Sequence, residues 1–470
     1  MAEEQLKEDH LSQMIFTTLS AIGFDREWLL QKSEAQKEIF KLADRLNETF
    51  NFPIKIELVG STAEGVSLSS SDMDCMIIIT DTICVDTANI SNGFNIVEAE
   101  YINTPPGYVK LVLAYGDEDS ALFECLHQSD LYKAYFGRVY ISSPIFRNFF
   151  LQSMQAINKV RDGYVCFETQ GPAITIERID HVLAMYFYGG CYLSNWSKRV
   201  RYYHWPSVSL IQEITSMEGY VVPVGHKSSD SQNIEWRVCY TIAELKLIKS
   251  LTDVQLKFYI LFKYVAKEIK KNVCEDISSY IVKNIVFWIV ETEPEQAFVP
   301  SNLVKLLKKA IMFIKYSLQN NHLPNYMIPE RNLIRENMNG KEKHRIIAGL
   351  VEYENFALHK LPRLNECINF FNQMLESHQI DFYREWRRKV ENCFLASALC
   401  KIDHFKLEML FKRTRMMDIE WEFFKDKRFW PIMITLFDLT VPDWINLILS
   451  GQLEYMLQLL YSRLREMPYL

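Results

Sequence analysis

Two aspartates one residue apart, Asp72 and Asp74, are the side chains of this chain best placed for chemistry. They stand where an apolar run, residues 76–79, begins to read as a buried strand. Because side chains alternate along a strand, both carboxylates are expected on one face. Two such carboxylates repel each other unless a cation lies between them. Mg²⁺ is the natural candidate, because it takes carboxylate oxygens together with substrate phosphates.

The residues before the aspartates suit a phosphate group. A strand pattern ends at Val59, and Gly60 and Ser61 follow it directly. Glycine allows a close approach of the backbone, and a hydroxyl with free amides at the start of a helix can receive a phosphate. Taken alone, the acids are more typical of a turn capped by its own side chains. Together with Gly60 and Ser61 they predict a metal-dependent nucleotide site.

A third acid, Asp180, lies in a later strand-like region, 173–188, next to its more apolar half. A buried, unpaired aspartate is costly, so it should be neutralised, paired or bound to a metal. Three carboxylates around two metal ions are the arrangement for in-line phosphoryl or nucleotidyl transfer. The third acid therefore favours transfer chemistry over simple nucleotide binding.

Composition restricts the class of protein. Hydrophobic residues make up 49% and charged residues 24% of the 470 residues, which is ordinary for a soluble globular protein. A net charge of −7 argues against a generally nucleic-acid-coated protein and leaves room only for a local basic patch. The ten cysteines show no zinc-ligand spacing and fit reduced cytosolic thiols. No signal peptide or membrane span is expected, and the predicted location is cytoplasmic.

The chain reads as an α/β part followed by a helical part. Helical spacing covers residues 5–50, strand patterns follow, and residues 81–93 read as a polar loop. Beyond Ala243 every segment reads as helix. The pattern predicts N-terminal helices at 1–50, a core at 51–243, a helical lobe at 244–337 and a C-terminal helical extension at 338–470.

Five segments occur in an ordered set: GSTAEG with SDMDCM, GPAIT with IDHVLA, NIEWRVCYTIAE, SSYIVKN and LPNYMIP. Together they resemble the cyclic GMP-AMP synthase family and the wider Mab-type nucleotidyltransferases, specifically the animal cGAS-like receptors. The resemblance runs from about residue 55 to about residue 333. It implies an α+β fold, in which a polymerase-β-like nucleotidyltransferase core with a mixed twisted sheet carries a helical C-terminal lobe and further C-terminal helices.

The resemblance also implies an activity. Such enzymes join ATP and a second nucleoside triphosphate, here GTP or UTP, into a cyclic dinucleotide for innate antiviral signalling. By matching position, Asp72, Asp74 and Asp180 would be the catalytic residues that bind two Mg²⁺ or Mn²⁺ ions. Asp180 would also help to activate the attacking ribose hydroxyl. Gly60 and Ser61 would hold the donor's β- and γ-phosphates.

Further nucleotide-binding residues follow from the same resemblance: Arg237, Glu244, Lys263, Ser278, Ser279 and Tyr280. The arginine would reach the acceptor nucleotide and Glu244 its base, while Lys263 and the serines would contact the triphosphate. Tyr280 would stack on a base. Each has a structural alternative: Arg237 stacked on Trp236, a serine N-cap, a core tyrosine, or a lysine on a solvated helix face.

Two departures from the family concern its ligands. The chain runs from IAELKLIKSL directly into TDVQLKFY, without the histidine–cysteine insertion of the mammalian enzyme, so no zinc is expected. Cys239 stands where the family often has a serine, which leaves the acceptor base open. Double-stranded RNA, or DNA, would activate the enzyme and pair it as a homodimer. Basic residues predicted to contact it are Lys198, Arg199, Arg201, Lys249 and Lys257.

Two other functions fit the same residues. A Mab-type protein of this kind could bind a nucleotide without catalysis and act by interaction through its helical lobe. A nucleotidyltransferase that extends RNA ends is the third hypothesis. The intact set Asp72, Asp74 and Asp180 favours the active cyclic dinucleotide synthase.

Overall fold

The computed structural model describes residues 2–49, 53–68, 72–87, 95–115, 132–135, 138–160, 167–176, 179–336, 338–355, 358–411, 427–441, 443–450 and 452–465. The basic residues 412–415 and 425 of the C-terminal extension lie outside these ranges. None of the helices that the structure describes combines the length and apolar character needed to span a bilayer.

Two helices open the chain, as the sequence predicts. Helix α1 (Ala2–Ala21) and helix α2 (Arg26–Thr49) are separated by a turn at Gly23, which has a φ of +92°. Asp25 starts the second helix, because its carboxylate accepts a hydrogen bond from the Trp28 amide at 3.3 Å.

The described strands form one 11-stranded mixed sheet. Their bounds are β1 Ile54–Val59, β2 Met73–Val85, β3 Asn95–Glu100, β4 Tyr108–Tyr115, β5 Tyr132–Tyr135, β6 Arg138–Ile141, β7 Phe167–Gln170, β8 Ala173–Ile176, β9 Ile179–Phe187, β10 Gly219–Val222 and β11 Glu235–Cys239. The region predicted as one strand at 173–188 is a hairpin of β8 and β9. Residues 81–85 continue β2, where a polar loop was predicted, because alternate side chains such as Thr82 and Cys84 are buried.

Strand β2 closes the sheet on itself. Its first half pairs with β1 and its second half with β3 on one edge, while β9 runs parallel to it on the other edge. The order β2-β3-β4-β11-β10-β9 therefore returns to β2 and forms a ring. A mixed sheet packed against helices confirms the α+β class, but the closed ring is not a clear polymerase-β-like sheet.

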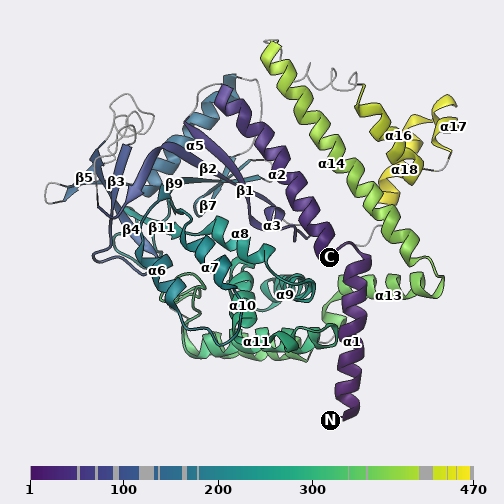
Figure 1. Cartoon of the computed structure of the whole chain (residues 1–470), viewed down its shortest axis with the longest axis horizontal. Helices are drawn as coiled ribbons and strands as arrows, with labels where there is room; N and C mark the ends of the chain where they lie inside the picture. The colour runs from purple at the N-terminus through teal and green to yellow at the C-terminus, as the bar shows by residue number, and fades with distance from the viewer. Residues whose placement is uncertain are drawn as a thin grey trace.

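The remaining described helices pack beside and beyond this sheet. Their bounds are α3 Gly60–Ala63, α5 Ser143–Val160, α6 Cys191–Lys198, α7 Val208–Thr215, α8 Thr241–Lys249, α9 Asp253–Asn272, α10 Ser279–Thr292, α11 Leu303–Gln319, α12 Gly340–Glu354, α13 Pro362–Glu376, α14 Ile380–Phe411, α16 Phe429–Thr440, α17 Trp444–Leu449 and α18 Leu453–Arg465. In Figure 1, α8 lies next to the strands and α9 and α10 lie below it, with α11 on their far side, whereas α14 and α16 to α18 lie beyond α2, away from the strands.

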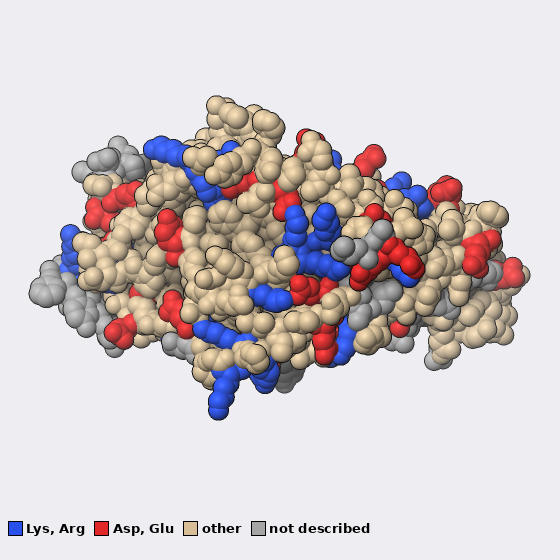
Figure 2. Space-filling model, turned by 90° about the horizontal axis from the view of Figure 1, so that it is seen from below, with Lys and Arg blue, Asp and Glu red and all other residues tan. Residues whose placement is uncertain are grey.

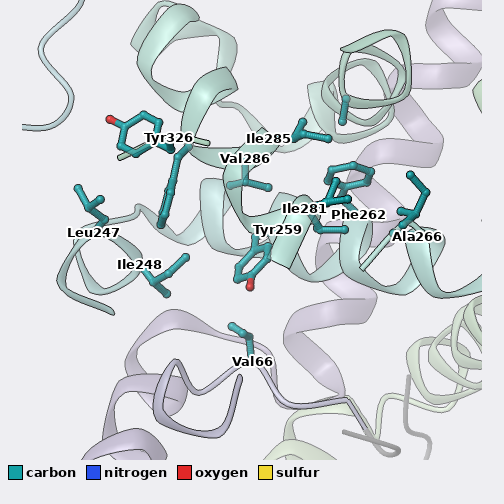
Figure 3. Packing of buried hydrophobic residues seen from close by; sticks show 14 of the residues in the cluster. Val66, Leu247, Ile248, Tyr259, Phe262, Ala266, Ile281, Ile285, Val286 and Tyr326 are labelled. Atoms are coloured by element: carbon teal, nitrogen blue, oxygen red, sulfur yellow. The ribbon is translucent and has the colours of Figure 1, made fainter. Parts of the chain in front are cut away.

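One hydrophobic core joins the sheet to the helical part. The same buried cluster contains Ile77 and Leu183 from the sheet and Phe262 and Ile285 from the helices. Figure 3 shows Val66, from the loop after α3, facing the helices that carry Tyr259 and Ile281. Because packed interiors deform little, this shared core fixes the helices relative to the strands.

Helix α14 of the C-terminal extension packs along α2, and a half-buried acid joins them. The Glu391 carboxylate accepts a hydrogen bond from Trp28 Nε1 at 2.7 Å and pairs with Lys32 Nζ at 3.1 Å. Arg387 Nε of the same helix lies 3.1 Å from its other oxygen. Burial alone would raise the pKa of Glu391, but Lys32 and Arg387 lower it overall. The extension is therefore attached to α2 through a satisfied polar cluster.

Substituting Glu391 should show how far the attachment of α14 to α2 depends on this carboxylate. Glu391→Ala leaves the half-buried Lys32, the buried Arg387 and Trp28 Nε1 without their acceptor, so we expect a loss of about 3 kcal/mol in the free energy of unfolding by urea denaturation. The control is Glu385→Ala on the same helix, whose exposed pair with Lys389 should change stability by less than about 0.5 kcal/mol. Equal losses in both variants would contradict the inference.

Candidate active site

Two of the three predicted metal ligands lie side by side. Asp74 of β2 and Asp180 of β9 are direct partners in the parallel register, so their side chains point to the same face. Asp72 comes one residue before β2 and is exposed at the same end. A pocket of about 310 Å³ between the sheet and the helical part collects these acids with basic, hydroxyl and apolar side chains: Ser61, Leu68, Asp72, Asp74, Asp180, Lys263, Ala266, Lys267, Lys270, Ile277, Ser279 and Val282.

Charge is concentrated at Asp74. Burial, and then the neighbouring carboxylates of Asp180 and Glu64, raise the pKa of Asp74 to about 6. Across the pocket, burial lowers the pKa of Lys263 to about 8, although Glu64 and Asp74 act against that shift. A cation bound between neighbouring carboxylates reduces the repulsion between them.

The fit to a metal ion rests on two acids. Among the described residues, no three His, Cys, Asp or Glu side chains form a ready-made metal cluster. Asp74 and Asp180 are adjacent, whereas Asp72 lies at the exposed end of the pocket. Mg²⁺ is commonly held by one or two carboxylates with substrate phosphates and water supplying the other ligands. Asp74 and Asp180 would hold such an ion, and its remaining ligands would come from outside the protein.

Thr175 is a residue that the sequence did not single out. It lies opposite Asp180 in the β8–β9 hairpin, and its hydroxyl donates a hydrogen bond to Asp180 Oδ1 at 2.6 Å. This contact fixes the orientation of the carboxylate. The sequence would have indicated this pair only through the register of the hairpin. That register depends on the length of the turn, which the strand patterns do not give.

The position of the Asp74 side chain requires a glycine at residue 60. The neighbouring residue Val59 pairs with Asp74 across β1 and β2, and Gly60 then begins α3 with a φ of +64°. A Cβ at this position would lie 2.0 Å from Asp74 Oδ2. Glycine therefore lets the chain turn directly beside the carboxylate, which brings Ser61 into the pocket.

Lysines of α9 form the opposite wall. Lys263 is only 7% exposed, and its Nζ donates a hydrogen bond to the Val66 carbonyl at 3.1 Å. Lys267 and Lys270, one and two turns further along, also line the pocket. The sequence prediction included Lys263 but missed the other two, although the i, i+4, i+7 spacing on one helix would have connected them.

The three residues at the start of α10 have different environments. Ser278 is the N-cap of α10, because its Oγ accepts a hydrogen bond from the Ile281 amide at 3.3 Å. Ser279 lines the pocket. The Tyr280 hydroxyl donates to Glu244 Oε1 at 3.1 Å and accepts from Arg331 Nη2 at 3.0 Å. The capping interpretation of Ser278 is confirmed.

Arg237 and Glu244 lie outside the pocket lining. Glu244 is 4% exposed and pairs with Lys283 Nζ at 2.8 Å. Trp236 packs edge-to-face with Phe146 in the main core, and its strand neighbour Arg237 points to the opposite face. The alternative of an Arg237–Trp236 stack is therefore wrong. Arg237 Nε is buried and has no hydrogen-bond partner within the described part of the chain.

The predicted nucleic-acid contacts are largely used inside the protein. Arg199 and Arg201 both pair with Glu291, at 2.7 and 3.0 Å, and lie over aromatic rings. Lys257 is 1% exposed and pairs with Asp253. These three side chains therefore cannot form an open phosphate-binding surface, which corrects the sequence prediction.

The other two candidates are more accessible. Lys198 is exposed, and Lys249 lies 3.5 Å from Glu34. On the face shown in Figure 2, Lys and Arg side chains are interspersed with Asp and Glu side chains. That face therefore presents mixed charge.

The fold and the pocket define an α+β protein with paired carboxylates facing a basic helix. Residues 242–351, which cover α8 to the last turns of α12, match the family model described as the Mab-21 protein HhH/H2TH-like domain. This is the C-terminal domain of the Mab-21 and cGAS-like nucleotidyltransferase family. The helical part opposite the carboxylates is therefore similar to a domain found in that family.

A substitution at Gly60 should separate backbone strain from crowding of Asp74. Gly60→Ala suffers both, whereas Gly171→Ala has a similar φ of +60° and open space around the added Cβ. We expect Gly171→Ala to cost about 1 kcal/mol in unfolding free energy and Gly60→Ala at least about 2 kcal/mol more. Urea denaturation measures both, and similar costs would show that Asp74 does not impose the glycine.

The pKa of Asp74 predicts a pH dependence in metal-free protein. Because the folded protein keeps its proton up to about pH 6 and the unfolded chain loses it near pH 4, wild type should lose stability relative to Asp74→Asn as pH rises through this window. We expect the difference to change by about 2 kcal/mol. Denaturation with chelator measures it, and a flat or opposite trend would contradict the shift.

Proposed function

We propose that this chain is a metal-dependent nucleotidyltransferase that joins ATP and a second nucleoside triphosphate into a cyclic dinucleotide. The observation that carries the proposal is the direct pairing of Asp74 with Asp180 on a pocket that also contains Ser61 and Lys263. The Mab-21 domain match supports the transferase class. A polymerase-β-like arrangement of the core belongs to the same proposal.

The proposed roles follow from where the side chains lie. Asp74 and Asp180, with Asp72 at the exposed end, hold Mg²⁺ or Mn²⁺, which supplies charge neutralisation to the phosphates when bound. Ser61 binds the donor phosphates from one side of the pocket, and Lys263, Lys267 and Lys270 stabilise them from the other. Ser279 completes the phosphate contacts at the start of α10.

In the proposed transfer, one bond to phosphorus forms and one breaks. The ribose hydroxyl oxygen of the acceptor forms a bond to the α-phosphorus of the donor, and the bond from that phosphorus to the β-phosphate oxygen breaks. Pyrophosphate leaves with the electron pair. Asp180 accepts the hydroxyl proton, and Thr175 holds Asp180 in orientation through its hydrogen bond. A second transfer of the same kind closes the ring.

The acceptor side is proposed around Arg237. Its buried Nε has no partner among the described residues, so a ligand acceptor would satisfy it. GTP and UTP both present carbonyl oxygens suited to a guanidinium. Double-stranded RNA is the proposed activator, with Lys198 and Lys249 as the accessible contacts, dimerisation on the ligand, and a cytoplasmic location.

A second candidate function is a non-catalytic nucleotide-binding or interaction protein. The specific observation in its favour is that Glu244 and the Tyr280 hydroxyl, both predicted nucleotide contacts, are engaged in bonds within the protein. Binding of a nucleotide without turnover would support this candidate over the synthase.

Product analysis tests the proposal. Purified protein is incubated with all four NTPs, Mg²⁺ or Mn²⁺, and double-stranded RNA or DNA, and products are identified by mass spectrometry. We expect a cyclic dinucleotide whose formation falls at least about 10³-fold in Asp74→Asn and in Asp180→Asn, because the transferring phosphate loses its charge stabilisation.

Asp381→Asn is the matched control, since this side chain is exposed on α14, far along the chain from the pocket residues. It should retain wild-type activity. A product that extends a primer would indicate RNA-end transfer, and product formation that is indifferent to both pocket substitutions would refute the synthase.

A further inference from the structure

A second charged cluster lies near the pocket residue Lys263 but does not line the pocket. Lys283 of α10 is 7% exposed, and its Nζ lies 3.1 Å from Glu64 Oε1 and 2.8 Å from Glu244 Oε2. The other oxygen of each carboxylate is also bonded, because Tyr259 donates to Glu64 at 2.9 Å and Tyr280 to Glu244 at 3.1 Å. The buried cluster is therefore fully satisfied.

The cluster is held together by charge. Burial alone would lower the pKa of Lys283, but Glu244 and Glu64 raise it well above its ordinary value. The lysine therefore stays protonated between two carboxylates. Such a group is rigid, because removing any member leaves another charge buried without a partner.

Three of the elements that meet in the cluster, α3, α9 and α10, also carry a pocket residue, whereas α8 with Glu244 does not. Glu64 ends the short helix that begins at Gly60, and its amide donates to the Gly60 carbonyl at 3.0 Å, one turn from Ser61. Tyr259 precedes Lys263 by one turn of α9, and Ser279 precedes Lys283 by one turn of α10. Ser61, Lys263 and Ser279 all line the pocket. The Lys283–Glu64 pair therefore links α10 to α3, and the Tyr259–Glu64 hydrogen bond links α9 to the same residue of α3.

Contacts beside the cluster also hold the loop after α3 in place. Figure 3 shows the Tyr259 hydroxyl directed toward the loop that carries Val66. Lys263 Nζ reaches the Val66 carbonyl from the same helix. The loop after α3 is thus held by α9 at two points and by α10 at Glu64.

We propose that Lys283 is a positioning residue, which holds the Gly60–Ser61 turn against α9 and α10 and so fixes the phosphate-binding residues relative to the paired aspartates. This inference rests on the proposed nucleotidyl transfer. Lys283 acts through Glu64 and Tyr259, and the substrate does not touch it.

The primary test uses Lys283→Met alone and with Glu64→Gln. The single variant leaves Glu64 and Glu244 facing each other, so it should lose both stability and function. The double variant removes that repulsion and should recover part of the thermal stability, because Glu244 then keeps only its hydrogen bond from Tyr280. It should still show kcat/KM reduced by about 10²-fold, because the link between α3 and α10 stays broken. Recovery of activity together with stability would show that Lys283 acts only on stability.

A milder pair of variants guards against loss of folding. Tyr259→Phe removes one hydroxyl from the cluster, and Tyr264→Phe removes one from the same helix outside it. Hydrogen–deuterium exchange of residues 60–66 should be faster in Tyr259→Phe than in wild type, and unchanged in Tyr264→Phe. Equal exchange in both variants would overturn the positioning role.

These readouts separate the two proposals. If wild-type protein neither binds nor converts any NTP, the proposed nucleotidyl transfer is refuted, and with it the functional role of Lys283. If wild type turns over and residues 60–66 exchange normally in Lys283→Met, the positioning role alone is refuted.

Discussion

The parallel pairing of β2 with β9 is the constraint on which the rest of the structure depends. It closes the sheet into a ring, and it sets Asp74 directly beside Asp180. Burial and then the neighbouring Asp180 carboxylate raise the pKa of Asp74, so a charged carboxylate in this position is unfavourable. The backbone beside Asp74 must also leave room for its carboxylate, which is why a glycine, Gly60, suits the turn at this position. A strained, charged centre of this kind is typical of functional sites.

The site is divided between two parts of the chain that share one core. The sheet and α3 supply the acids and Ser61, while α9 and α10 supply the lysines and Ser279. Neither part alone encloses the pocket. Because a continuous hydrophobic cluster runs through both, the two halves are positioned by packing as well as by the bonds of Lys283.

Much of the pocket could be predicted from residue types, spacing and resemblance. Asp74 and Asp180 were recognisable as acids beside buried strands, and Ser61, Lys263 and Ser279 lie in the same pocket. Thr175 was missed because its partner is set by hairpin register. Arg199 and Arg201 were misjudged because a local basic run does not reveal Glu291, which lies about 90 residues further along. The sequence shows which side chains are charged, but the fold decides which of them form ion pairs with residues far away in the sequence.

The contact between α2 and α14 has a consequence for how the protein is made. Trp28 and Glu391 are 363 residues apart, yet they meet in one half-buried cluster. During synthesis, α2 therefore leaves the ribosome long before the helix that covers it. Contacts of such high sequence separation form late and slowly, and surface that awaits its partner is prone to aggregation. We expect the nascent chain to need protection along α2 until α14 emerges.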